Sequence, residues 1–408
     1  MANGDTCGTF CGTGGPYLLV EILNTNAEAS GGSPSPQKNS ALANVMNAET
    51  KFAALFLGAG VQMRCGVGQF TQLLSEAVDR LDPGRCTTLT LTRSEGSIAD
   101  IWRAVGSTRS VVCNYPIVAW KRVILRPLLA LAIAKLRRRR VVLILHEWAS
   151  LHWLRRITYL PALLLADTII TFSPQVRREL AGHIFFGWTT AKCALAPLPP
   201  NVEAPQDVAD SPLRQRLATA HQSGRLVIGH FGSIYPGKQP DTLLDIASIL
   251  KRRGCKPLIV YVGSFIKGLD TVEQDFYARV KELRLSEDVV VSGYVAADAE
   301  VFGLFKEIDA FCYPLQDGLT ARRSSVLASV QSCRPVIATG SAEPDEFDHH
   351  PRFKELIEDG SIVLVPRGSD DGVYADKILA SLKQSRIYPP FNFADWWRDT
   401  ANAIKAQL

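Results

Sequence analysis

The sequence LVIGHFGSIYPGK, from Leu226 to Lys238, joins a short apolar run to a turn rich in Gly and Pro. A helical pattern follows it, from Asp241 to Arg253. Residues 226–231 are typical of a buried strand, because they form a short apolar run that ends at a glycine. A strand, a glycine turn and a helix in this order predict a parallel sheet covered by helices. The stretch therefore indicates an α/β protein.

The same alternation continues from this stretch to the end of the chain. Further strands are expected at 258–262, 289–291, 310–313, 336–338 and 362–365, and helices at 272–283, 297–306, 324–332 and 371–383. A last amphipathic stretch, 393–407, follows Pro389-Pro390. Residues 201–390 therefore read as one doubly wound domain.

The alternation also runs through residues 51–200. Strands are expected at 53–57, 87–91, 111–114, 141–145 and 168–172, and helices at 67–80, 118–138, 151–165 and 174–181. Residues 196–224 break the pattern with five prolines between 197 and 212, so we expect a hinge there. Residues 1–50 are rich in Gly, Ser, Asn, Thr and Pro, which is typical of a flexible leader. Two doubly wound halves place a ligand cleft between the carboxyl ends of their sheets.

Composition excludes several classes of protein. The 408 residues are 47% hydrophobic and 21% charged, unlike a disordered, collagen-like or disulfide-scaffold chain. Nine cysteines, an odd number, several of them in apolar runs, favour free thiols in a reducing compartment. The start of the chain shows no secretory signal pattern, and no apolar run reaches the ~20 residues that span a bilayer. We therefore expect a cytoplasmic protein.

Charge is concentrated in the first half of the chain. Residues 51–200 carry 20 basic and 8 acidic side chains, whereas the whole chain has a formal charge of +5. Basic residues flank the apolar stretch 123–136 and lie among the aromatic residues of 148–159, a pattern that suits an anionic membrane surface. A core helix with a solvated basic end explains the same pattern equally well. A nucleic-acid partner is not expected, because no nucleic-acid fold signature accompanies the charge.

Two glycine turns are candidates for phosphate binding. Gly66-Val67-Gly68 precedes a helix, whose free N–H groups could face a phosphate, although a plain tight turn explains it as well. No third glycine follows at the dinucleotide spacing, which argues against a nicotinamide dehydrogenase. In the second half, Gly232 and Ser233 lead to Lys238 at the start of a helix, where a cation could hold a diphosphate.

The loop Pro314–Ser325 is a third candidate. Asp317 and Gly318 form a turn, and Arg323 precedes two hydroxyls, Ser324 and Ser325, at the start of a helix. Together they predict an anion site, and the alternative is a capped helix with solvated arginines. His146 and Glu147 follow a strand of the first half and indicate a polar cleft, although a lone histidine can equally hold a loop. No D-x-D and no convincing His/Cys metal spacing occurs, so we expect no metal and no cofactor.

In the order of these motifs, the chain resembles the retaining GT-B glycosyltransferases of group 1, the family 4-like branch. The resemblance covers about 52–408 and rests on Gly66-Val67-Gly68, His146, Gly232 to Lys238, Ser292-Gly293-Tyr294-Val295 and Pro335-Val336. It implies two Rossmann-like domains facing each other across a cleft, with residues 391–408 crossing back to the first domain as a helix.

The resemblance also implies residue roles. The Gly66–Gly68 loop would face the donor sugar and phosphates, and His146 would lie near the transferred sugar. Lys238 would hold the diphosphate, and backbone groups at Tyr294 and Val295 would read the base. Arg323, Ser324 and Ser325 would close on the diphosphate, and Gly318 and Thr320 of the same loop would also bind the donor. The catalytic residues would be His146, Lys238 and Asp317.

Two departures from the family pattern concern charged residues. Ser233 stands where many members carry Arg, and Thr320 and Ala328 stand where many carry a Glu pair. Asp317 would replace part of that pair if its loop folds toward the cleft.

These observations predict a metal-independent glycosyltransferase of the hexosyltransferase type, acting in surface polysaccharide or glycoconjugate synthesis. It would move a sugar from a nucleoside-diphosphate sugar to a saccharide or lipid-linked saccharide, in the cytoplasm or on the inner face of a membrane. Two alternatives remain open. One is a non-catalytic sugar-nucleotide-binding protein, and the other is a sugar-nucleotide epimerase, which would need cleft acids that are missing between Thr320 and Pro335.

Overall fold

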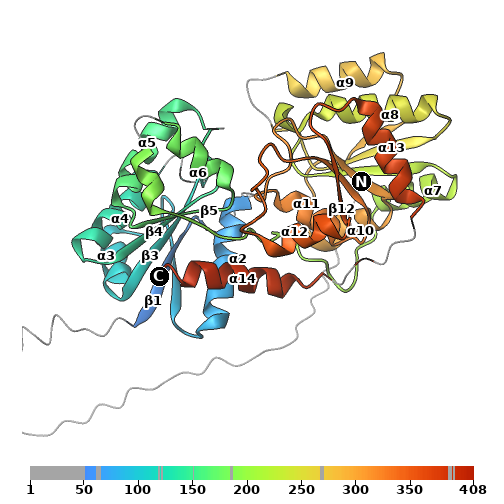
Figure 1. Ribbon diagram of the computed structural model, residues 1–408. Helices are drawn as coiled ribbons and strands as arrows, with labels where there is room; N and C mark the ends of the chain where they lie inside the picture. The colour runs from blue at the N-terminus through green and yellow to red at the C-terminus, as the bar shows by residue number, and fades with distance from the viewer. Residues whose placement is uncertain are drawn as a thin grey trace, which may run out of the picture. The chain divides into compact units, whose positions relative to one another are not determined.

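A computed structural model describes residues 51–60, 66–117, 120, 123–149, 151–183, 187–266, 271–384, 388 and 391–408 (Figure 1). The expected leader, residues 1–50, lies outside the described residues, as do Lys121 and Arg122 of the basic run. Residues 49–408 form one compact unit, which contains two parallel sheets.

The first sheet has the order β2-β1-β3-β4-β5-β6 and is parallel throughout. Its strands are β1 (Phe52–Gly58), β2 (Cys86–Thr90), β3 (Thr108–Tyr115), β4 (Arg140–Leu145), β5 (Thr168–Thr171) and β6 (Cys193–Leu195). Its helices are α2 (Gly66–Leu81), α3 (Ile98–Gly106), α4 (Leu125–Leu136), α5 (Trp153–Leu165) and α6 (Pro174–Ala181), with a 3₁₀ turn η2 (Gly187–Lys192). We call this sheet and its helices the first lobe.

Alternate residues of each strand serve the two faces of this sheet. On β1, Leu55 and Leu57 pack with α3, α4 and α5, whereas Ala54 and Phe56 pack with α2 and the last helix, α14 (Phe393–Lys405). The chain therefore ends by covering the lobe in which it began, and α14 lies beside α2 (Figure 1). Trp397 of α14 is fully buried, and its indole N–H donates to the Pro200 carbonyl at 3.1 Å.

The second sheet has the order β12-β11-β10-β7-β8-β9, also parallel. Its strands are β7 (Leu226–Phe231), β8 (Pro257–Val262), β9 (Val289–Val291), β10 (Ala310–Tyr313), β11 (Val336–Thr339) and β12 (Ile362–Val365). One face packs on α7 (Pro212–Gln222), α10 (Asp298–Lys306), α11 (Ser324–Val330) and α12 (Pro351–Glu358), and the other on α8 (Pro240–Arg252), α9 (Val272–Glu282) and α13 (Asp371–Leu382). We call this sheet and its helices the second lobe.

The order of the second sheet reverses between β7 and β10, where the chain moves from one half of the sheet to the other. In open α/β sheets, ligands bind at the carboxyl ends of the strands beside such a reversal. The turn η3 (Pro236–Lys238) follows β7 at this edge and leads into α8.

The predicted α/β class is confirmed, and most predicted strands match within two residues. Three helices and one short strand, α3, α7, α12 and β6, were not predicted. The expected hinge 196–224 contains α7, which starts where the Ser211 hydroxyl caps the Arg214 N–H. Helix α4 begins only at Leu125, because Pro127 fits the first turn of a helix but not its interior. No helix in the described ranges has the length and apolarity needed to cross a membrane.

Candidate functional site

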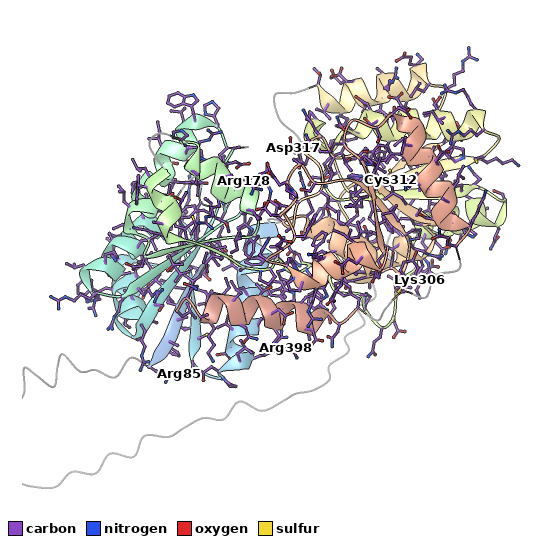
Figure 2. The ribbon with its side chains drawn as sticks, viewed as in Figure 1. Arg85, Arg178, Lys306, Cys312, Asp317 and Arg398 are labelled. Carbon is purple, nitrogen blue, oxygen red and sulfur yellow. The ribbon has the colours of Figure 1, made fainter. Side chains whose placement is uncertain are left out.

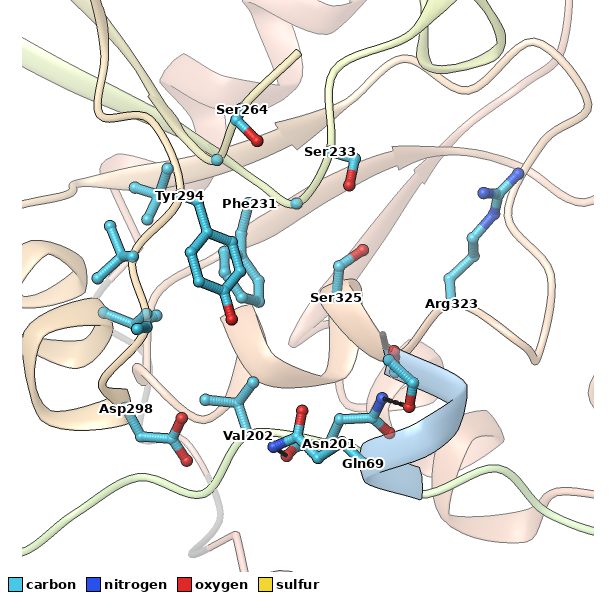
Figure 3. Close-up of a pocket in the computed structure, with 18 of the residues that line it drawn as sticks. Gln69, Asn201, Val202, Phe231, Ser233, Ser264, Tyr294, Asp298, Arg323 and Ser325 are labelled. Atoms are coloured by element: carbon cyan, nitrogen blue, oxygen red, sulfur yellow. Dashed lines mark hydrogen bonds between the residues drawn. The ribbon is translucent and has the colours of Figure 1, made fainter. Parts of the chain in front are cut away.

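A cavity of about 660 Å³ opens at the carboxyl ends of both sheets (Figure 3). The second lobe lines it with the segments that follow β7, β8, β9 and β10, and the first lobe with Gly60 and the start of α2. Asn201 and Val202, in the segment that joins the two sheets, complete the wall. Both lobes therefore meet around one hollow at the reversal of strand order.

The turn after β7 brings backbone close to the cavity. Gly232 has φ +114°, and a Cβ there would lie 2.6 Å from the Lys238 Nζ. A Cβ on Gly263, after β8, would lie 2.1 Å from the Gly232 carbonyl oxygen. Gly232 needs glycine because of its positive φ, and Gly263 needs it because a side chain would meet the backbone of Gly232. The amine of Lys238 is thereby held against bare backbone.

Lys238 is a buried cation on the cavity wall, with 7% of its surface exposed. Burial, with Arg323 as the second cause, lowers the pKa of Lys238 to about 7. It forms no ion pair with any described residue. On β7, burial and then the charge of Lys238 lower the pKa of His230 to about 3. A buried amine without a counter-ion favours an anionic ligand.

Tyr313 of β10 ties the two cavity loops of the second lobe together. Its buried hydroxyl accepts from the Phe231 N–H at 3.2 Å and lies 2.6 Å from the Ser329 hydroxyl oxygen and 3.2 Å from the Ser325 carbonyl. The turn after β7 and the start of α11 are thus fixed relative to each other. This tie holds Ser324 and Ser325 opposite Gly232.

Two arginines precede α11 on the cavity wall. The guanidinium of Arg323 donates to the Tyr235 hydroxyl at 3.1 Å. Burial and Arg323 lower the pKa of Arg322, and the carboxylates of Glu179 and Glu147 oppose that effect. Arg322 stays charged at any physiological pH. With Lys238, these residues make the centre of the cavity strongly cationic.

The first lobe contributes the start of α2. The Gln69 side chain donates to the Asn201 carbonyl at 3.1 Å, and the Asn201 side chain donates back to the Gly66 carbonyl at 3.3 Å (Figure 3). This reciprocal pair fixes the connecting segment against the first turn of α2. No acidic side chain lies in that turn, so the positive end of the helix dipole is not neutralised there.

The far end of the cavity is less charged. Tyr294 is 52% exposed, and both Tyr294 and Phe231 line the wall (Figure 3). Asp298 lies at the start of α10 and accepts from the Glu203 N–H at 3.3 Å. Burial raises the pKa of Asp298. This end offers an aromatic face and one carboxylate to a ligand.

Many residues predicted from sequence lie together on this wall. They are Gly66, Gly68, Gly232, Ser233, Lys238, Tyr294, Val295, Arg323, Ser324 and Ser325. Val67 instead packs against the core of the first lobe. The sequence prediction did not include Gln69, Asn201, Asp298 and Arg322. Arg322 had a signal in the paired arginines, whereas Asn201 lies in a connecting segment with no motif.

His146 does not line the cavity, although Arg322, which does, acts on it. Burial and then Arg322 lower the pKa of His146 to about 3, so the ring is neutral at pH 7. Its Nε2 atom lies 3.3 Å from the Asn114 Oδ1, and its ring contacts Phe70 and Phe172.

The loop after β10 does not turn Asp317 into the cavity. Asp317 is exposed on the second lobe (Figure 2), and Gly318 and Thr320 are buried away from the wall. Gly318 has φ +77°, and a Cβ there would lie 2.2 Å from the Gly340 carbonyl, so its glycine serves loop packing. A buried carboxylate does reach this loop, because Glu346 accepts from the Ala321 N–H at 3.0 Å.

The described residues contain no group of three or more His, Cys, Asp or Glu side chains that could hold a metal ion. The expectation of a metal-independent site remains a prediction.

Comparison with solved structures identifies the fold. HepE of Anabaena, solved with UDP, aligns with a TM-score of 0.55 at 16% identity, over 87% of this chain and 95% of that one. WaaG, a glycosyltransferase of lipopolysaccharide biosynthesis, aligns at 0.51 and 12%, over 87% and 98%. Sucrose-phosphate synthase of Thermosynechococcus elongatus aligns at 0.51 and 14%, over 87% and 94%. No family model and no curated protein matches the sequence. The chain has the GT-B fold of two Rossmann-like domains.

Proposed function

We propose that this chain is a glycosyltransferase that moves a sugar from a nucleoside-diphosphate sugar to a saccharide or lipid-linked saccharide acceptor. The observation that carries the proposal is the buried, unpaired Lys238 beside Arg323 at the strand-order reversal of the second sheet. A diphosphate supplies the negative charge that this arrangement lacks. HepE, which has the same fold, was solved with UDP and with UDP-glucose.

The proposed donor lies along the wall of the second lobe. Tyr294 and Val295 contact the base, and Asp298 accepts hydrogen bonds from ribose hydroxyls. Lys238, Arg323, Ser324 and Ser325 contact the diphosphate. The sugar then faces the first lobe, toward Gly66 and Gly68.

In the proposed reaction, the bond between the anomeric carbon and the diphosphate oxygen breaks, and the acceptor oxygen bonds to that carbon and loses its proton. Negative charge develops on the leaving diphosphate in the transition state. Cations already fixed at that position stabilise it without reorganising, and this is the usual source of most rate enhancement. Lys238 and Arg323 serve this role without a metal. Retention of the anomeric configuration is part of the proposal through the family resemblance.

Donor binding is the first test. We expect UDP-glucose to raise the melting temperature, because a ligand selective for the folded state stabilises it by mass action. We expect GDP-mannose and ADP-glucose to raise it less, because HepE, which has the same fold, was solved with UDP-glucose. Lys238→Gln should remove most of this shift, and Arg216→Gln, an exposed charge on α7, should leave it intact.

Turnover separates transfer from binding alone. The chain is incubated with radiolabelled UDP-glucose and a total lipid and glycan extract. Release of UDP with label in a non-nucleotide product supports the enzyme. Binding without release would instead support a non-catalytic sugar-nucleotide-binding protein, the alternative favoured by Thr320 and Ala328 at the Glu positions.

The cellular setting is also a proposal. We place the chain in the cytoplasm or on the inner face of a membrane. The basic run gives this weaker support than its sequence suggests. Lys135 pairs with Asp167 at 2.6 Å, Arg137 stacks on Trp102 at 3.9 Å, and Arg139 donates to the Gly106 carbonyl at 2.8 Å. These cations have partners within the protein.

A further inference from the structure

A second pocket of about 280 Å³ lies on the first lobe, apart from the residues of the donor cavity. It is formed by the end of β3, by Ile117, Trp120 and Ile124, and by the first turns of α5. Its lining includes Tyr115, Trp120, Ile124, Arg155, Thr158 and Tyr159. We call it the α5 pocket.

The floor of the α5 pocket is aromatic and contains an unused donor. The rings of Tyr115 and Trp120 lie 5.7 Å apart, and those of Tyr115 and Tyr159 lie 4.6 Å apart. Trp120 is 2% exposed, and its indole N–H has no acceptor among the described residues. A buried donor without a partner is unfavourable, so the pocket favours a ligand that brings an acceptor oxygen.

Arg155 supplies a cation at the same pocket. Its side chain forms no hydrogen bond or ion pair with the described residues. The next residue differs, because the guanidinium of Arg156 donates to the Leu151 carbonyl at 2.9 Å and also bonds the Ala149 carbonyl. An available guanidinium and an indole N–H at one pocket suit a phosphate.

An uncovered apolar face begins at the rim of the pocket. Leu154, Ile157 and Leu164 of α5 are 53%, 54% and 57% exposed, and Pro161 is exposed between them. Their spacing of three, four and three residues places them on one face of the helix. Leu154 belongs to both the pocket lining and this face. We call the four residues the α5 stripe.

We propose that the α5 pocket binds the phosphate head of a lipid and that the α5 stripe contacts its alkyl chain. The charge and the indole N–H match the head, and the exposed apolar face matches the chain. If the proposed glycosyl transfer is correct, this ligand is the lipid-linked acceptor. The pocket adjoins the segment that carries His146, because the backbone N–H of His146 donates to the carbonyl of Tyr115, a pocket residue, at 3.0 Å.

Calorimetric titration of the full chain tests head and chain separately. Three probes are used below their micelle concentrations: dodecyl phosphate, butyl phosphate and dodecyl glucoside. We expect dodecyl phosphate to bind at least about tenfold more tightly than either of the others, because only it offers both the charge and the apolar length. Equal affinities of dodecyl and butyl phosphate, or of dodecyl phosphate and dodecyl glucoside, would overturn the proposal.

Variants assign each preference to its residue. Arg155→Gln should abolish the preference for phosphate over glucoside, and Ile157→Ser should reduce the preference for the long chain. Thr158→Trp, at an exposed position, should fill the pocket and weaken dodecyl phosphate at least about tenfold. Matched controls are Arg216→Gln, and Leu136→Ser on α4, where Leu136 is 73% exposed but lies outside the pocket. Loss of binding in Leu136→Ser equal to that in Thr158→Trp would indicate a general membrane surface and overturn the pocket.

Failure of this inference is separable from failure of the proposed function. UDP-glucose binding is measured on the same variants, and none of their positions lines the donor cavity. Intact donor binding without dodecyl phosphate binding would overturn the pocket alone. Dodecyl phosphate binding without donor binding would support the pocket and contradict the donor proposal.

Discussion

At the residue scale, Lys238 carries most of the argument. Sequence predicted its position after the first strand of the second half, but not its burial or the closeness of its amine to the Gly232 backbone. Burial lowers the pKa of Lys238 to about 7, with Arg323 as the second cause. A diphosphate would reverse both effects, so protonation and donor binding are coupled.

This coupling predicts the pH dependence of donor binding. An anion raises the pKa of Lys238 from about 7 toward its usual range, so binding takes up a proton at pH values between the two. Affinity for UDP-glucose should be highest below pH 7 and fall up to about tenfold per pH unit above it. Calorimetry at pH 8 in two buffers of different ionisation enthalpy measures the uptake. Uptake of the same number of protons by wild type and by Lys238→Gln would contradict the coupling of Lys238 protonation to donor binding.

A second prediction concerns the space at Gly232. Gly232→Ala would bring a methyl group 2.6 Å from the Lys238 Nζ, so donor affinity should fall at least about tenfold. Gly224→Ala is the matched control, because Gly224 also has a positive φ, +74°, but nothing lies within 4 Å of its Cβ position. Both variants should lose roughly 1–2 kcal/mol of stability from the backbone strain. Titration with UDP-glucose separates them, and equal affinities would show that Lys238 tolerates the methyl group.

At the element scale, the alternation of apolar runs and helical patterns was sufficient to predict the two sheets. Their strands are fully buried, so each forms an apolar run that periodicity detects. Short elements were missed for a physical reason. Helix α3 has only nine residues, Ile98–Gly106, and β6 has only three. Such elements depend on tertiary packing, which a local pattern does not contain.

The same limit applies to the candidate site. Residues with a turn or capping signature, such as Gly232 and Ser324, could be predicted because their chemistry is local. Asn201 could not, because its role depends on contact with Gly66 across 135 positions of the chain. Asp317 illustrates the converse, since its turn was predicted but the direction in which the loop points was not.

Helix α14 gives a prediction at this scale. Trp397 is 1% exposed, contacts the Phe70 ring at 5.3 Å and donates to the Pro200 carbonyl. Trp397→Ala should therefore lower the free energy of unfolding by about 3–5 kcal/mol. The control is Trp153→Ala on α5, where the Trp153 side chain is 60% exposed. It should change the free energy of unfolding by less than about 0.5 kcal/mol. Urea unfolding measures both, and a small loss for Trp397→Ala would show that α14 is not a stabilising part of the first lobe.

At the scale of the whole molecule, the second lobe also contacts the first lobe and the connecting segment outside the cavity. Arg178 of α6 pairs with Asp345 at 3.0 Å, and the His350 ring donates to the Leu198 carbonyl at 2.9 Å. The loop after β11, which supplies Asp345 and His350, also holds Ala321 through Glu346. One loop therefore connects the first lobe to the segment that carries Arg322 and Arg323.

That connection predicts an effect on donor binding at a distance. Glu346→Gln keeps an acceptor for the Ala321 N–H, whereas Glu346→Leu removes it. We expect Glu346→Leu to weaken UDP-glucose binding at least about threefold and Glu346→Gln to weaken it less, because the loss of a buried hydrogen bond lets the arginine loop move. Calorimetric titration measures both, and equal affinities for wild type and Glu346→Leu would separate this loop from the site.

The central claim is that the cavity between the lobes holds the diphosphate of a sugar donor. A crystal structure of the chain with UDP-glucose tests it most directly. The account predicts diphosphate oxygens within hydrogen-bond distance of the Lys238 Nζ and the Arg323 guanidinium, with the uracil beside Tyr294. A diphosphate bound elsewhere, or a Lys238 side chain turned away from it, would contradict the account.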